Sequence, residues 1–258
     1  MNALTSARRS RHAPALLVLL ALLLTGGLYA LMSPAADAEV GSASDIDGGQ
    51  KLFQANCSTC HGLNAEGNDI GPSLIGVGAA SVDFQVSTGR MPMASNSVQA
   101  PRKEPMFDAQ QTSMLAAYVA SLGAGPGIPS AEAVDPTLGN PANGMQLFRT
   151  NCAMCHNAVG AGGALSEGKY APPLYKATPT QIYTAMLTGP QAMPVFNEAS
   201  ITPEGKRDII AYLMEQRETA PGGLTLGSLG PVSEGLWAWV LGLGSLIGIA
   251  VWIGAKSS

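Results

Sequence analysis

The chain has 258 residues, 46% of them hydrophobic and 5% aromatic, and a formal net charge of −4. This length has room for one or two domains. The segment from Glu39 to Glu234 contains 10 Lys/Arg and 17 Asp/Glu, a net charge of −7. A surface with this excess of acid repels phosphates, so the composition argues against a nucleic-acid partner.

The N-terminus has the order of an export signal. Arg8, Arg9 and Arg11 precede an apolar run over residues 13–32, and small residues surround Asp37. Positive charge, an apolar segment and a small-residue site are typical of a secretory signal. The run is also long enough to span a bilayer at about 1.5 Å rise per residue. Residues 1–38 are therefore predicted to be a cleaved signal peptide or a retained N-terminal membrane anchor helix.

Two copies of the motif C-x-x-C-H, at 57–61 and 152–156, contain all four cysteines of the chain. The motif is typical of c-type haem attachment, in which two thiols bind one porphyrin and the adjacent imidazole is an axial ligand of the iron. Zinc ribbons place their cysteine pairs roughly 15–20 residues apart, whereas 91 residues separate these pairs. A disulfide framework leaves the histidines unexplained. The sequence predicts two covalently bound haem c groups, held by Cys57, Cys60, Cys152 and Cys155, with His61 and His156 as iron ligands.

The sequence around the two motifs is duplicated. Residues 49–57 align with residues 144–152 at a constant offset of 95. Farther along, residues 71–74 align with residues 171–174 at an offset of 100, so the second unit has gained five residues before Pro172. The repeat predicts two similar domains, at 45–122 and 140–217.

Both units lack an alternating strand pattern, so the predicted fold class is all-α. Each begins with an amphipathic helix that leads into its motif, and closing helices are expected at about 111–122 and 203–217. In the second unit, residues 178–181 combine an N-cap Thr, a proline at the first helical position and a capping-box Gln, with Gly189 as the stop.

Segments rich in Gly, Pro and Ala follow each unit. We expect residues 123–139 to be a linker and residues 218–235 to be a tether to the C-terminal segment. Residues 94–109 have no counterpart in the second unit. A solvated insertion is the simpler interpretation of this stretch, and a docking loop is the alternative.

Residues 236–254 form a second apolar segment, with no charged residue. Such a segment is typical of a transmembrane helix, the alternative being a buried core helix. Trp237 and Trp239 suit the outer interface and Lys256 the inner one. The protein is therefore predicted to lie in the cytoplasmic membrane, with its C-terminus in the cytoplasm and both units on the extracytoplasmic side.

Each iron needs a second axial ligand unless it is open to small molecules. The third histidine, His12, belongs to the leader, so methionine is the soft ligand that remains, and it raises the reduction potential. The repeat pairs Met91 with Met193, and each is followed by a proline. Met93 lies close enough in sequence to rival Met91.

Pro72 and Pro172 occupy equivalent places after the two motifs. Their backbone carbonyls are candidates to accept the proton from the other ring nitrogen of each axial histidine, which would fix the ring and tune the iron. The alternative is that both prolines are simple loop residues.

The order of these motifs resembles the class I cytochrome c domain. C-x-x-C-H follows a G-x-x-L-F helix, and G-P-x-L, T-G-x-M-P and a closing helix with Tyr come after it, over residues 45–122 and 140–217. The resemblance implies two compact helical domains in tandem. With an N-terminal apolar segment and a C-terminal transmembrane helix, the whole layout resembles the dihaem cytochrome c subunit of the actinobacterial cytochrome bcc complex, a menaquinol:cytochrome c oxidoreductase.

This resemblance implies a subunit of a quinol–cytochrome-c reductase (translocase) that has no catalytic residues of its own. It would work beside cytochrome b and relay electrons from a Rieske iron–sulfur centre to a haem-copper oxidase. The haem at Cys57 and Cys60 would face the Rieske protein, and the haem at Cys152 and Cys155 would face the oxidase. The alternatives are a membrane-anchored dihaem carrier, a cytochrome subunit of a dehydrogenase or another oxidase, and a dihaem peroxidase with one open iron.

Overall fold

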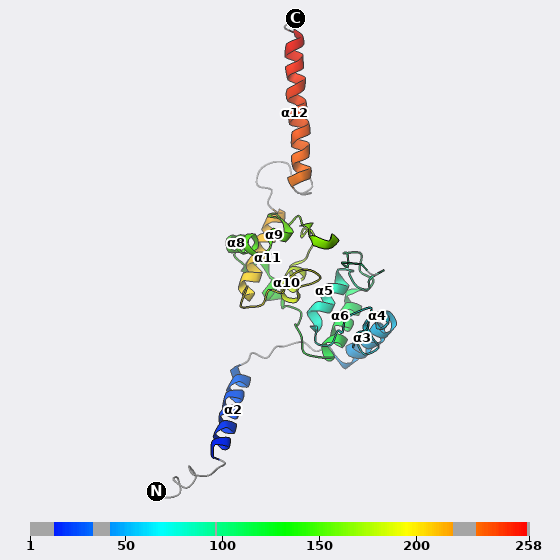
Figure 1. The fold of residues 1–258 in the computed structure, drawn as a ribbon, viewed down its shortest axis with the longest axis vertical. Helices are drawn as coiled ribbons and strands as arrows, with labels where there is room; N and C mark the ends of the chain where they lie inside the picture. Colours follow the sequence, from blue (N-terminus) through cyan, green and yellow to red (C-terminus); the bar gives the residue numbers. More distant parts are fainter. Residues whose placement is uncertain (1–12, 33–41, 96, 219–230, 257–258) are drawn as a thin grey trace, which may run out of the picture. The chain divides into compact units, whose positions relative to one another are not determined.

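The computed structural model describes residues 13–32, 42–95, 97–218 and 231–256, most of them in helices (Figure 1). Internal contacts divide the chain into two units, residues 1–38 and 39–258. In the first unit, helix α2 spans Ala13–Met32, the bounds of the apolar run in the sequence. The expected cleavage site at 36–38 lies outside the described residues, so the fate of this segment stays a prediction.

Helix α12 spans Pro231–Lys256 and contains the expected membrane segment. Within the described ranges, one helix is long and apolar enough to cross a bilayer, Gly235–Lys256, and none of its apolar window is buried. A core helix of a soluble domain would be covered by its neighbours. The exposure of α12 therefore favours a membrane span over a core helix. Most of the expected tether, 219–230, lies outside the described residues.

The two domains have equivalent helices in the same order. Those of the first domain are α3 (Ala43–Asn56), α4 (Ser58–His61), α5 (Gly78–Ser87) and α6 (Ala109–Ser121). Those of the second domain are α8 (Pro141–Asn151), α9 (Ala153–His156), α10 (Pro179–Thr188) and α11 (Pro203–Glu218). The predicted all-α class is confirmed, and the repeat in the sequence is a repeat in the structure.

The five extra residues of the second unit lie in a stretch with a small irregularity. Strands β1 (Gly163–Ala164) and β2 (Tyr170–Ala171) form an antiparallel ladder, with the 3-10 turn η2 (Ser166–Gly168) between them. Two-residue strands are too short to show an alternating pattern, which is why the sequence gives no sign of them.

Local capping chemistry accounts for several helix boundaries. Thr178 and Gln181 form a reciprocal capping box at the start of α10, and Gly189 ends that helix in the left-handed conformation at φ 61°. Asp108 and Gln111 form the same box at the start of α6. Helix α5 has no side-chain cap, because its N-cap residue is Val77. Without a capping signal, this helix is not predicted from the sequence of the first unit.

In each domain the helix before the motif crosses the closing helix at a glycine. A Cβ on Gly49 would lie 2.0 Å from the Met114 carbonyl oxygen, and a Cβ on Gly144 would lie 1.8 Å from the Asp208 carbonyl oxygen. Both distances are far below van der Waals contact, so only glycine lets the two backbones approach this closely.

The aromatic rings beside these crossings pack in the same way in both domains. The ring centroids of Phe53 and Tyr118 are 5.3 Å apart, and those of Phe148 and Tyr212 are 5.6 Å apart. Tilted pairs at this separation are favourable. The G-x-x-L-F string shared by the two halves of the repeat thus supplies both the glycine and the ring of each helix crossing.

We expect Gly49→Ala to destabilise the folded chain by about 1–3 kcal/mol or more, because the new methyl group overlaps backbone that cannot move aside. Gly48→Ala is the matched control on the same helix. Its Cβ would meet the flexible end of Met114, with the sulfur at 3.1 Å, and alanine is favoured over glycine in a helix by about 0.5–1 kcal/mol. Thermal unfolding of the haem-loaded chain measures both. Equal melting temperatures for the two variants would contradict the close crossing.

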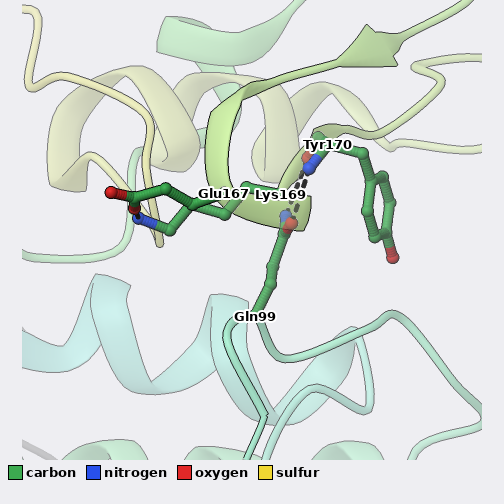
Figure 2. Close-up of polar contacts among 4 residues, drawn as sticks. All are labelled: Gln99, Glu167, Lys169 and Tyr170. Atoms are coloured by element: carbon green, nitrogen blue, oxygen red, sulfur yellow. Dashed lines mark hydrogen bonds and ion pairs between the residues drawn. The ribbon is translucent and has the colours of Figure 1, made fainter.

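The two domains contact each other through residues 94–109. Gln99 Nε2 donates to the Tyr170 carbonyl at 2.8 Å, and the Tyr170 N–H donates to Gln99 Oε1 at 2.9 Å (Figure 2). In a third bond the second domain supplies the side chain and the first domain the backbone: the Ala100 N–H donates to Gln191 Oε1 at 3.0 Å. Most of this stretch is exposed, as expected for an insertion, but Gln99 and Ala100 bind the second domain. It is therefore also a docking loop, whose partner is the other half of the same chain.

Helices α5 and α10, which are equivalent in the repeat, also pack against each other (Figure 1). The segment 123–139 lies against both domains. The Ala80 N–H donates to the Pro126 carbonyl at 3.0 Å, and Val134, in α7 (Ala131–Val134), belongs to the core of the second domain. The turn η1 (Pro136–Leu138) packs on α11. Residues 123–139 therefore form a packed connection.

Candidate haem sites

The motif histidines make the same backbone contact in both domains. His61 Nδ1 lies 2.8 Å from the Pro72 carbonyl oxygen, and His156 Nδ1 lies 3.1 Å from the Pro172 carbonyl oxygen. A carbonyl oxygen accepts only, so Nδ1 carries the proton in each ring. The lone pair of Nε2 is then free for a metal.

A cavity of ≈ 210 Å³ lies in the second domain. Its wall brings together both thiols of the second motif, His156 and Met193. Most of the remaining wall is apolar, with contributions from Phe148, Ile182, Met186, Phe196, Ile209 and Leu213. Two thiols, an imidazole and a thioether around an apolar space are the donor set that haem c requires, so the residues present fit this group.

Burial disfavours the charged forms of Cys152 and His156 in the second site. It raises the pKa of the Cys152 thiol to about 12, with Cys155 adding to the effect. It lowers the pKa of His156, although the bond to Pro172 opposes the shift. In the first domain, burial and then Cys60 raise the pKa of the Cys57 thiol to about 11. Neutral thiols and a neutral imidazole suit an apolar cavity.

In the first domain, Met91 packs against the hydrophobic cluster that also contacts Cys57. Met93 is half buried too, but among the described residues it is not part of this cluster. Two other methionines, Met186 and Met154, line the cavity of the second domain. Met186 is 2% exposed on α10, and Met154, inside the second motif, is 91% exposed.

Alternative uses of the cysteines find no support. All four cysteines are free, so the disulfide reading fails. In the part of the chain that the structure describes, no three His, Cys, Asp or Glu side chains gather closely enough to hold a metal ion. A zinc ribbon needs four such ligands.

Sequence reasoning missed the contribution of the first domain to the second cavity. Phe84, Thr88, Arg90, Gln99 and Arg102 all line it. Arg90 is only 8% exposed, and burial, followed by the neighbouring Arg102, lowers its pKa. One sequence feature could have indicated this contribution. Arg90 stands in the string T-G-R-M-P, whereas the corresponding part of the second unit has no cation.

Models of known protein families match both domains. The family model "Cytochrome c" matches residues 46–123, and the model "Cytochrome C oxidase, cbb3-type, subunit III" matches residues 139–213. The chain is 48% identical to the cytochrome bc1 complex cytochrome c subunit of Mycobacterium tuberculosis, over 96% of this chain and 92% of that one. It is 44% identical to the subunit of the same name from Corynebacterium diphtheriae, over 97% and 96%.

The chain belongs to the family of cytochrome bc1 complex cytochrome c subunits. Its two cytochrome c domains carry covalently bound haem c. As a member of this family it takes part in electron transfer within a membrane-associated respiratory complex. The family resemblance inferred from the sequence is thereby confirmed.

Proposed function

We propose that the chain relays electrons through its two haems in series, from a Rieske iron–sulfur centre to a haem-copper oxidase. It would act as the cytochrome subunit of a quinol–cytochrome-c reductase, beside cytochrome b and the Rieske subunit. Each haem supplies a one-electron couple of its iron. The side chains attach, orient and enclose the haems and perform no substrate chemistry.

The proposed ligand set follows the repeat. The thiols of Cys57 and Cys60, and of Cys152 and Cys155, form the thioethers to the two haems. The axial ligands are His61 with Met91 in the first domain, and His156 with Met193 in the second. Two observations support this set: the carbonyls of Pro72 and Pro172 orient the two imidazoles alike, and Met193 lines the same cavity as His156. Met91 is preferred to Met93 because it packs in the cluster around Cys57.

The main observation in support of the proposed relay is the direct contact between the two domains. Helix α5 packs on α10, and paired hydrogen bonds join Gln99 to Tyr170. Two carriers with a flexible connection would have to meet before each transfer, whereas packed domains keep their haems in a fixed relation. We propose that the first-domain haem receives the electron and the second-domain haem delivers it.

We further propose that both domains lie on the extracytoplasmic side of the cytoplasmic membrane. Helix α12 would enter the membrane with Trp237 and Trp239 at the outer interface and Lys256 at the inner one. The Lys256 ammonium lies 4.8 Å from the centroid of the Trp252 ring, which suits a cation–aromatic anchor at a membrane surface.

Isolation of the native assembly in mild detergent tests the proposal. The expected result is co-purification with cytochrome b, a Rieske protein and a haem-copper oxidase, and oxygen reduction driven by menaquinol. Both haems should become reduced on mixing with menaquinol. A chain that purifies alone, or a complex in which menaquinol reduces neither haem, would overturn the proposal and favour a tethered carrier.

A further inference from the structure

Two arginines of the first domain line the cavity of the second domain. Arg90 and Arg102 both belong to its wall, together with Cys152, Cys155 and His156. Arg102 is exposed, but Arg90 is 8% exposed. Arg90 is mostly covered by protein, and the space it lines is the cavity of the other domain. A cation in such an apolar site is favourable only with a partner that offsets its partial loss of hydration.

Nothing in the described protein neutralises Arg90. Arg90 takes no part in the ion pairs Lys51–Asp47 and Lys169–Glu167, and no carboxylate is among the groups that shift its pKa. The Arg90 guanidinium carbon lies 4.9 Å from the centroid of the Phe84 ring. A cation–aromatic contact contributes about 0.5–2 kcal/mol, whereas burying an uncompensated ion costs several kcal/mol. The missing partner is an anion inside the cavity.

The cavity itself identifies that anion. The thiols and imidazole in its wall fit haem c, whose only anionic groups are its two propionate carboxylates. We propose that Arg90 and Arg102 of the first domain bind the propionates of the haem attached to the second domain. This inference rests on the proposed attachment of that haem to Cys152 and Cys155.

The backbone of the first domain holds the two arginines together. The Lys103 N–H donates to the Thr88 carbonyl at 3.3 Å, and a Cβ on Gly89 would lie only 2.1 Å from the Lys103 carbonyl oxygen. The residues that follow Thr88 therefore run beside those that precede Glu104. Two guanidinium groups in this arrangement match two carboxylates, since each planar fork donates two parallel hydrogen bonds to a carboxylate.

The contacts between the domains place this pair at the cavity. Gln99, three residues before Arg102, is held by both of its hydrogen bonds to Tyr170 (Figure 2). Tyr170 also lines the cavity. The second haem would thus be enclosed by one domain and charge-compensated by the other. Positive charge beside a haem disfavours the ferric state, which carries the extra positive charge, so the arginines would raise its reduction potential.

Redox titration of the full chain in its complex tests this role. In Arg90→Gln/Arg102→Gln we expect the equilibrium constant for reduction of the second haem to fall about tenfold or more, which is about 59 mV for one electron. In the single variant Arg102→Gln the first haem should keep its potential, because Arg102, unlike Arg90, is not adjacent in the chain to the proposed ligand Met91. Arg90→Lys should lose less than Arg90→Gln, because lysine keeps the charge but not the planar fork. Arg149→Gln is the matched control: Arg149 is exposed on α8 of the second domain, outside the cavity wall, and its removal should change neither potential.

The two haems are told apart by repeating the titration in a Met193→Ala background, in which the second haem titrates at lower potential. The arginine changes should then shift that low-potential component. A shift in the other component alone, or no shift, rejects the proposal. If Arg90→Gln loses haem, the single variant Arg102→Gln decides, because its exposed side chain contributes little to folding.

Covalent haem content separates this outcome from a failure of the proposed haem attachment. A wild-type chain without haem at the second motif rejects the attachment itself. A chain with both haems and both methionine bands, but no response to the arginine changes, rejects only the role of the arginines.

Discussion

Replacing Cys152 and Cys155 together by Ala is expected to halve the covalently bound haem per chain. The two thioethers hold the second haem, so without them it is not retained through denaturing electrophoresis. Haem staining and the mass of the intact polypeptide measure the loss. Retention of the full haem content in the double variant would reject the second motif as an attachment site.

The same change should unfold the second domain. Without haem, the apolar wall of the ≈ 210 Å³ cavity is left in contact with water, and each apolar side chain that loses its cover costs about 1.5–3 kcal/mol. A small domain is stable by only about 5–15 kcal/mol. Rapid proteolysis after residue 122 with the first domain left intact is the expected pattern. Met145→Ala is the control, because Met145 is exposed on α8 and lies outside the cavity wall, and it should leave haem content and proteolysis unchanged.

Replacing Met193 by Ala is expected to lower the reduction potential of the second haem by roughly 0.1–0.3 V, within the span of about 0.8 V that axial ligands set. A thioether favours the softer ferrous iron, and its loss leaves the site to water, a harder ligand that favours the ferric state. The near-infrared charge-transfer band between methionine sulfur and ferric haem should fall by half. Redox titration and this band are the two measurements.

Matched methionine changes sharpen the assignment. Met145→Ala, on the partly exposed side of α8, should leave both potentials and the band unchanged. In the first domain, Met91→Ala should halve the band, and Met93→Ala should not. An unchanged potential in Met193→Ala rejects that residue as a ligand. A wild-type haem without the band, together with peroxide turnover, would favour the peroxidase alternative.

The internal repeat predicted the features that depend on local sequence. The capping residues at 178 and 181 mark the start of α10 as expected. The repeat also aligned Gly49 with Gly144, although their role at the two helix crossings was seen only in the structure. The contacts of the two histidines with the Pro72 and Pro172 carbonyls are also present. The iron-ligand roles of these histidines and of the methionines stay predictions until the variants are measured.

The contacts between the domains could not be predicted in this way. Gln99 and Tyr170 are far apart in the chain and lie in stretches without a matching partner in the repeat. Their hydrogen bonds depend on the packing of α5 against α10, and α5 itself has no capping signal. A polar loop with Arg102, Lys103 and Glu104 looks the same in sequence whether it faces water or another domain. Arg90 was missed for the same reason.

Besides the packing of the equivalent helices α5 and α10, the two halves of the repeat also meet where they differ. The docking loop at 94–109 has no counterpart in the second half, and Tyr170 lies in the stretch that is longer in the second half than in the first. Each departure has its binding partner in the other, so a chain built from two copies of either half would lack this junction. The order of the two halves along the chain is therefore not interchangeable: exchanging them would require a new connection between the domains and a new path to the membrane helix.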